Sequence, residues 1–247
     1  MGILRRLFYS TLLAGSLATS PLAADKDGLD VEGRFAWAPR YSLLNLKESK
    51  TVPVHPADAG FISGSTQVKA GNGMEAFVFR PGIEGGLNYG NLRPKVGVDA
   101  EINLDQYLIN DKDGPTMSDF KQQTGDTRSA ENGSFAMDQF DRDFLGVYPF
   151  VGLDIKMGEG VLTAELGMPL YQNATRRWGH HRNDKFDGIG SETFALKGWR
   201  ARVAWGGAPN ADNYFGPSRL GLEFMVEKYT FEGGDINSFS IGLFTKF

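Results

Sequence analysis

Eight stretches of this 247-residue sequence alternate apolar and polar residues, and this pattern limits the fold more than any other feature. Successive side chains of a β-strand point to opposite faces, so each stretch is predicted to be a strand with one apolar face. In the last stretch, for example, Phe239, Ile241 and Leu243 share a face that is opposite Ser240 and Gly242. The predicted strands are residues 30–38, 74–89, 95–108, 143–157, 161–172, 194–206, 219–229 and 238–247.

The connections between these strands alternate in length. Three are long and polar and are predicted to be loops: residues 39–73, 109–140 and 173–193. Short strand extensions are expected inside the first loop, near residues 41–46 and 61–68. Glycine-containing turns near residues 90–91 and 158–160 join other strands directly. Long loops are therefore expected at one end of the fold and short turns at the other, as in outer-membrane-type barrels.

Three prolines interrupt this regular picture. Pro81, Pro149 and Pro169 lie inside predicted strands, where the missing amide donor removes a ladder hydrogen bond. Bulges or local breaks in the ladder are expected at these positions.

The amino-terminal segment has the composition of an export signal. Arg5 and Arg6 precede an apolar stretch over residues 7–17, and Ala23 and Ala24 supply small residues for cleavage. Residues 1–24 are therefore predicted to be a signal peptide, and residues 25–247 one exported domain. The sequence has no cysteine, so no disulfide framework is expected.

The charge of the chain bears on its partners. After loss of the two signal arginines, 24 basic residues face 30 acidic ones, a formal net charge of −6. An acidic chain without a basic patch is not expected to bind nucleic acid.

Alternation alone leaves the direction of the apolar face open, because a soluble lipocalin-like barrel would turn the same residues inward. Three features favour an outward, lipid-facing arrangement. The polar faces carry charges that could pair, such as Glu32 on the same face as Arg34. Aromatic residues recur near strand ends, where an interfacial girdle is found in membrane proteins; they are Trp37, Tyr89, Tyr107, Tyr171, Trp205 and Tyr229. The loop asymmetry and the terminal Phe247 agree with this arrangement.

With this layout, residues 29–247 resemble the small eight-stranded outer-membrane proteins of bacteria, such as the membrane domain of OmpA, OmpX and OmpW. The terminal Phe247, its alternating strand and the paired charges carry the resemblance, and no subfamily motif accompanies them. The resemblance implies an all-β fold, a transmembrane antiparallel up-and-down barrel of eight strands in the cell outer membrane. A ten-stranded barrel, with an extra hairpin inside residues 39–73, stays open.

The same resemblance implies partners. These are outer-membrane lipid, lipopolysaccharide and the outer-membrane assembly machinery, for which a terminal Phe such as Phe247 is part of the signal. The barrel is expected to be a monomer.

The interior of an eight-stranded barrel is just wide enough to be filled by side chains. Charges that face it are shielded from bulk water and must pair. We expect a salt-bridged plug, with a structural or surface-interaction role exercised through the long loops; a narrow porin-like channel for small polar solutes is the alternative. The predicted lumen charges are Glu32, Arg34, Arg80, Glu84, Lys95, Asp99, Glu101, Asp105, Glu165, Arg200, Arg202, Glu223, Glu227 and Lys246.

A lipid A-modifying hydrolase is a further alternative, since relatives that act on lipid A use Ser and His near the outer rim. The histidines of this chain, His55, His180 and His181, all fall in predicted loops. A nucleophile needs its base held within hydrogen-bond reach, so no catalytic residue is assigned and an enzyme is disfavoured. No cofactor or metal is expected, because the acidic segment at residues 110–114 lacks the full calcium-loop spacing.

One predicted loop segment is unusually cationic. Arg176, Arg177, Trp178 and Arg182 are expected just outside the membrane, where guanidinium groups could pair with lipopolysaccharide phosphates. A solvated cationic loop is the alternative reading of this segment.

Overall fold

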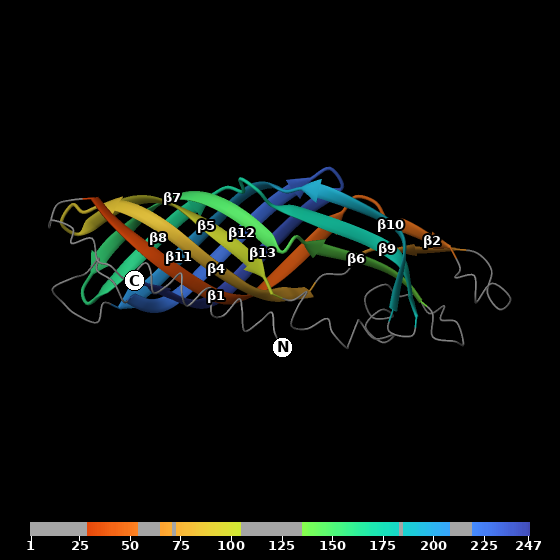
Figure 1. The fold of residues 1–247 in the computed structure, drawn as a ribbon, viewed down its shortest axis with the longest axis horizontal. Helices are drawn as coiled ribbons and strands as arrows, with labels where there is room; N and C mark the ends of the chain where they lie inside the picture. The colour runs from red at the N-terminus through yellow and green to blue at the C-terminus, as the bar shows by residue number, and fades with distance from the viewer. Residues whose placement is uncertain (1–28, 54–64, 71–72, 105–134, 183–184, 208–218) are drawn as a thin grey trace.

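The computed structural model describes residues 29–53, 65–70, 73–104, 135–182, 185–207 and 219–247 (Figure 1). Eight antiparallel strands close into a barrel, and each pairs with the next of the eight along the chain. The eight-stranded prediction is confirmed. The barrel strands are β1 (Leu29–Leu46), β4 (Gly73–Leu87), β5 (Leu92–Asn103), β7 (Leu145–Met157), β8 (Gly160–Gly167), β11 (Lys197–Gly207), β12 (Arg219–Phe231) and β13 (Gly234–Lys246).

The barrel closes where the first strand meets the last. β1 pairs with β13 along its length and with β4 on its other side, which leaves no free edge between them. Phe247 extends this seam, because its backbone exchanges two hydrogen bonds of 2.9 and 3.0 Å with Gly33. Its ring lies 5.0 Å from that of Phe35 and fills the space that Gly33 leaves open.

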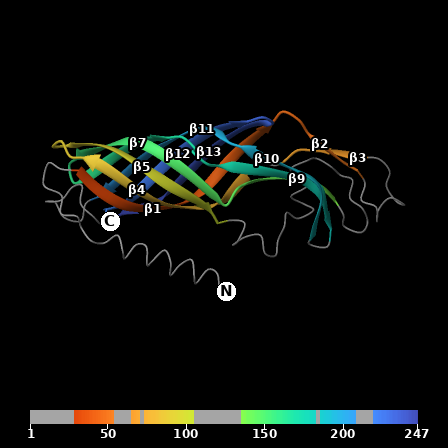
Figure 2. The same ribbon diagram turned by 45° about the horizontal axis from the view of Figure 1, so that its top comes forward.

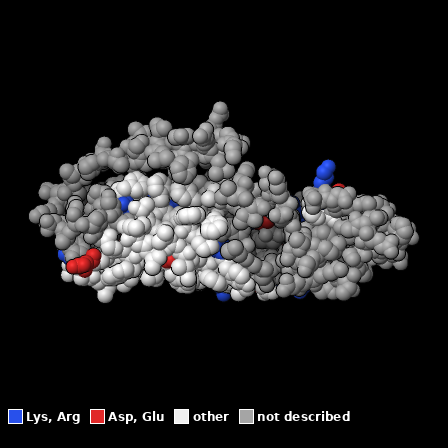
Figure 3. Space-filling view, turned by 90° about the horizontal axis from the view of Figure 1, so that it is seen from below, with Lys and Arg blue, Asp and Glu red and all other residues white. Residues whose placement is uncertain are grey.

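The two faces of the barrel wall are inverted relative to a soluble protein. Large apolar side chains are exposed on the outside, with Ile83 at 58%, Val203 at 49% and Leu220 at 66% relative accessibility. Charged side chains at alternate positions of the same strands are buried on the inside. In Figure 3 the flank of the barrel is accordingly almost free of charged atoms. An apolar exterior around a polar interior is the arrangement of transmembrane β-barrels.

Two of the three prolines coincide with weak points of the ladder. The pairing of β4 with β5 is interrupted between Phe79 and Gly82, on either side of Pro81. β8 ends at Gly167, so Pro169 lies beyond the strand that was predicted to contain it. Pro149 pairs with Val98 without a shift in register, and the one register shift in the pairs of β1 lies instead between Arg40 and Tyr41.

Five further strands project from one end of the barrel (Figures 1 and 2). They form a two-stranded sheet, β2–β3, and a three-stranded sheet in the order β10–β9–β6. The bounds are β2 (Lys50–Pro53), β3 (Ser65–Val68), β6 (Phe135–Arg142), β9 (Asn173–Arg182) and β10 (Lys185–Ala195). We call these five strands the extension.

The extension corrects two expectations. The segment 173–193 was predicted to be a loop, but long-range pairing of β9 with both β6 and β10 makes most of it strand. The hairpin within residues 39–73 does not enter the barrel, because β2 pairs only with β3 in a separate sheet. The ten-stranded alternative is therefore wrong.

Two apolar clusters mark the extension and the barrel end beneath it. The first lies where the barrel meets the extension and consists of Leu46, Ala70, Tyr148, Ala174, Leu196, Tyr229, Phe231 and Ile236. Phe231 lies at its aromatic centre, with ring centroids 5.2 Å from Phe140 and 5.0 Å from Phe194. The second cluster joins the two small sheets through Val52, Val68 and Met137. The extension therefore has a core of its own, which a set of independent loops would lack.

Among the described residues, no helix is long and apolar enough to cross a bilayer.

Candidate functional site

The barrel interior is lined with ionisable side chains. Within the described residues, nine basic and eight acidic side chains are buried there. Thirteen of the fourteen charges predicted for this interior are among them, and Asp105 lies outside the described residues. The near balance of charge matters because an unpaired ion in a low-dielectric interior costs several kcal/mol. We divide these side chains into a lower, a middle and an upper layer, counted from the end of the barrel that is opposite the extension.

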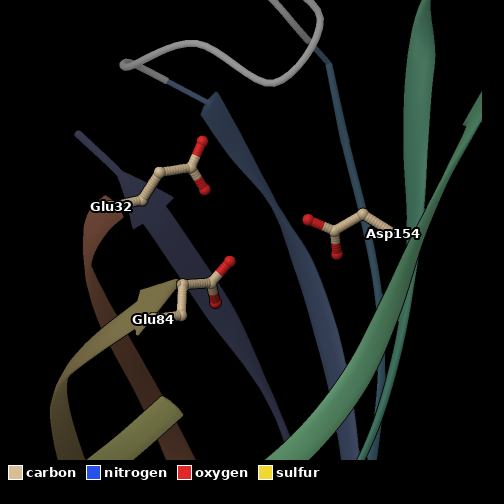
Figure 4. Close-up of side chains that lie close together, drawn as sticks. All are labelled: Glu32, Glu84 and Asp154. Atoms are coloured by element: carbon tan, nitrogen blue, oxygen red, sulfur yellow. The ribbon is translucent and has the colours of Figure 1, made fainter. Parts of the chain in front are cut away.

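The lower layer is built around three carboxylates. Glu32, Glu84 and Asp154 converge from β1, β4 and β7, and their oxygens lie within 4.8 Å of one another (Figure 4). Lys246 Nζ donates to Glu84 at 2.6 Å and to Asp154 at 3.1 Å. Lys95 Nζ lies 2.8 Å from Asp154. The carboxylate trio has the donor type for a divalent cation, but protein cations already lie among its oxygens.

Arg93 completes the lower layer. Its side chain is fully buried, and Nη1 lies 2.8 Å from Glu84, 3.1 Å from Asp154 and 3.3 Å from Glu32. Three carboxylates and three cations from β1, β4, β5, β7 and β13 are thus held in one cluster. This cluster ties strands together across the barrel as well as along its wall.

The middle layer depends on Arg34. Its Nε and Nη2 donate to the two oxygens of Asp99 at 2.8 and 2.5 Å, a bidentate pair. Its Nη1 donates to Glu165 at 2.6 Å. Gly82 makes the Asp99 contact possible, because a Cβ at that position would lie 2.2 Å from Asp99 Oδ1. Arg200 also donates to Asp99.

Glu223 and Glu165 extend the middle layer to the opposite wall. Arg202 donates to Glu223 at 2.6 Å and to Glu165 at 2.9 Å. Arg80 donates to the other oxygen of Glu223 at 2.7 Å. Glu165 and Glu223 each accept hydrogen bonds from two cations. Removing either carboxylate would therefore take a counter-ion from two buried cations.

The upper layer joins ions to hydroxyl groups. Arg40 donates to Glu101 at 2.5 Å and to Asn103 at 2.7 Å. Arg142, which reaches into the barrel from β6, donates to Glu227 at 2.9 Å and to Ser238.

Aromatic rings cover the guanidinium planes where carboxylates do not. Arg200 lies 4.0 Å from the ring centroid of Tyr148, and Arg34 lies 4.2 Å from that of Phe150. Such contacts are stronger when the cation is desolvated, as it is here. Tyr229, which the sequence placed in an outer aromatic girdle, is instead fully buried and points inward.

Four interior charges were missed by the sequence analysis: Arg40, Arg93, Arg142 and Asp154. Arg40 and Arg93 lie next to Pro39 and Pro94, just outside the strands predicted at residues 30–38 and 95–108. Asp154 could have been found by parity alone, since it alternates with Leu153 and Ile155. Arg142 lies between the loop predicted at residues 109–140 and the strand predicted at residues 143–157, and no local signal identifies it.

The cationic segment that was expected near lipopolysaccharide lies on β9. Arg176 is buried, and its guanidinium holds both oxygens of Asp138 at 2.5 to 3.1 Å. Burial raises the pKa of the Asp138 carboxyl above its ordinary value, and the bonds from Arg176 oppose this shift. Trp178 packs under the ammonium of Lys50, whereas Arg177 is exposed. The side chain of Arg182 lies outside the described residues.

His180 has structural surroundings. His180 is buried on β9, and its Nε2 lies 2.6 Å from the carbonyl oxygen of Pro53 on β2. A carbonyl can only accept, so Nε2 carries the proton in this bond. The contact fastens the two small sheets of the extension together. His55 falls outside the described residues.

Comparison with known proteins yields similarities of fold at low sequence identity. No family model and no curated protein matches the sequence. Neisserial surface protein A is 13% identical, with 90% of this chain and 100% of that chain covered and a TM-score of 0.40. Ail, the attachment invasion locus protein of Yersinia pestis, is 8% identical, with 90% and 99% covered and a TM-score of 0.40. The outer membrane protease OmpT of Escherichia coli is 9% identical, with 88% and 96% covered and a TM-score of 0.35.

Two features of the wall identify the class of fold: the barrel is closed, and its apolar side chains face outward while its charged side chains face inward. Only a closed barrel lets strands cross a bilayer with every backbone group paired, and only a lipid exterior suits a wall that exposes Ile83, Val203 and Leu220. The chain therefore folds as a small eight-stranded β-barrel with the apolar exterior and polar interior of a transmembrane barrel.

Proposed function

We propose that the barrel is a membrane anchor with a closed interior, and that the extension is the part that contacts other molecules at the cell surface. The observation that carries this proposal is the buried network of nine basic and eight acidic side chains. A pore for polar solutes needs water along its axis, whereas here each layer spans the interior with ion pairs. The apolar cluster around Phe231 adds a further obstacle at the loop end.

The extension supports the second half of the proposal. It is large, has its own core around Val52, Val68 and Met137, and is fastened by the bond from His180 to Pro53. Strand β10 forms one edge of its three-stranded sheet, and most of its residues are exposed. An exposed edge can accept an extended segment of another protein by backbone pairing. Residues 1–24 would direct export, and Phe247 would guide assembly into the membrane.

Single-channel recording tests the closed interior. Purified protein in a planar bilayer is expected to produce no stable conductance steps at neutral pH, while a porin added to the same bilayer does. Steady steps from the unaltered protein would contradict the proposal and favour the narrow channel for small polar solutes.

A shortened variant tests the role of the extension. Thr175 and Thr193 face each other across β9 and β10, and their hydroxyl oxygens are 3.2 Å apart. An Asn-Gly turn in place of residues 176–192 therefore joins Thr175 directly to Thr193 and removes the outer part of the β9–β10 hairpin. Phage-displayed extended peptides are expected to be retained by cells that display the intact protein and not by cells with the shortened variant. Equal retention by both, or none by the intact protein, would contradict the surface role, provided both barrels show the heat-dependent gel shift.

A further inference from the structure

The outward face of the barrel wall is almost free of charge, and its exceptions are grouped. Of the outward side chains described on the eight barrel strands, three are lysine or a carboxylate: Lys197, Lys228 and Asp235. All three lie at the loop end of their strands. Asp235 accepts hydrogen bonds from Asn45 at 3.0 Å and from Asn237 at 3.1 Å. The two lysines are exposed, and neither ammonium has an ion-pair partner within the described part of the chain.

The two lysines lie on neighbouring strands. In the register of β11 and β12, Trp199 is opposite Lys228, and Lys197 is opposite Thr230. Lys197 and Lys228 are therefore diagonal neighbours, a relation that separates backbone positions by roughly 7–8 Å. Lysine side chains are long enough for both ammonium groups to contact a single anion across this distance. Gly198 permits the close approach of the strands here, since a Cβ would lie 2.0 Å from the carbonyl oxygen of Lys228.

Their height on the wall coincides with the upper limit of the apolar surface. Lys228 follows the exposed Phe224 and Val226 at the next outward positions, and Lys197 precedes the exposed Trp199 and Val203 in the same way. Tryptophan favours the membrane–water interface, and lysine extends its charge from an apolar stem into the headgroup region. Lipid phosphates lie at this level.

We propose that Lys197 and Lys228 form a binding site for the phosphate group of a lipid in the leaflet at the loop end, with Trp199 against the upper part of its acyl region. The ligand class follows from charge and position. Two ammonium groups without protein partners face a lipid environment, and the nearby carboxylate of Asp235 is occupied by two asparagine amides. The site is distinct from the cationic segment on β9, where Arg176 is committed to Asp138.

Lipid enrichment measured by native mass spectrometry tests this site. The protein is reconstituted in phosphatidylcholine vesicles with a minor fraction of phosphatidic acid, released into the spectrometer, and scored for bound phosphatidic acid. The double variant Lys197→Gln/Lys228→Gln is compared with Lys69→Gln/Lys185→Gln, which removes two exposed lysines, one directly after β3 and one on β10. A lysine near an anionic surface contributes about a fivefold change in partition, so the double variant is expected to lose roughly 25-fold.

The variants distinguish a specific site at Lys197 and Lys228 from general attraction of the protein for anionic lipid. The control variant and Lys197→Arg/Lys228→Arg are expected to keep the enrichment of the unaltered protein, because both retain the two charges. Equal enrichment in the Lys197→Gln/Lys228→Gln variant would overturn the proposal. So would full displacement of the lipid by millimolar inorganic phosphate, which would show that a free anion suffices. Should the double variant fail the heat-dependent gel shift, the single variants Lys197→Gln and Lys228→Gln carry the same comparison, each with an expected loss of about fivefold.

Discussion

Replacing Glu84 with glutamine should weaken the barrel strongly without changing its shape. Glu84 is buried and touches four cations: Lys246 at 2.6 Å, Arg93 at 2.8 Å, Lys95 at 3.2 Å and Arg34 at 3.3 Å. Glutamine keeps the volume but removes the charge, so the four cations lose a shared counter-ion in a low-dielectric interior. Breaking a buried pair in this way typically costs about 3–5 kcal/mol. With a urea dependence of about 2 kcal/mol per molar, the unfolding midpoint should fall by roughly 2 M.

The assay is urea unfolding in lipid vesicles, followed by tryptophan fluorescence and by the gel shift of unboiled samples. Glu192→Gln provides the matched control, because the Lys50–Glu192 pair is partly exposed and should contribute at most about 1 kcal/mol. Removing a cation together with the acid, as in Glu84→Gln/Lys246→Met, should recover at least about 1 kcal/mol. A Glu84→Gln midpoint that matches the Glu192→Gln midpoint would refute the claim that the interior ion pairs support the barrel.

Three further predictions concern the wall, the seam and the barrel end. Val203→Arg places a charge on the exposed apolar face and should cost about 2–4 kcal/mol in vesicles, whereas the change would be nearly neutral on a water-exposed wall; urea midpoints in vesicles decide between the two. Gly33→Val should reduce the folded, heat-shifted fraction, because a Cβ at this position lies 2.5 Å from the ring of Phe247; a normal fraction would show that the ring does not need this space. Phe231→Ala should loosen the extension while the barrel stays folded, since the ring fills the centre of its aromatic cluster at a typical cost of about 3–5 kcal/mol; faster protease cleavage of the extension is the expected readout, and an unchanged rate would contradict it.

Parity along the strands explains why the wall could be predicted from sequence. Once residues 238–247 or 95–108 are read as strands, each side chain is assigned to one face, and the charges at Asp99, Glu101 and Lys246 follow at once. The strands predicted at residues 30–38 and 95–108 stop next to Pro39 and Pro94. Arg40 and Arg93 were therefore left out, although both follow the same alternation.

The partners of the interior charges could not be predicted. Arg34 meets Glu165 across 131 residues and Asp99 across 65. Such contacts depend on the tilt and stagger of the strands, which local alternation does not encode. The extension was missed for a related reason. Its strand β9 is rich in charge and carries Gly179, so its composition resembles a loop, and only pairing with the distant β6 makes it a sheet.

Folding of the purified chain with and without lipid decides whether the apolar wall faces a membrane. With vesicles or detergent, we expect a β-rich circular dichroism spectrum and different migration of boiled and unboiled samples, with extraction from vesicles only by detergent. Without them, we expect no stable folded protein, because the exposed faces of residues such as Ile83 and Leu220 would contact water. A folded, monomeric protein in plain buffer would contradict the assignment of these faces to lipid.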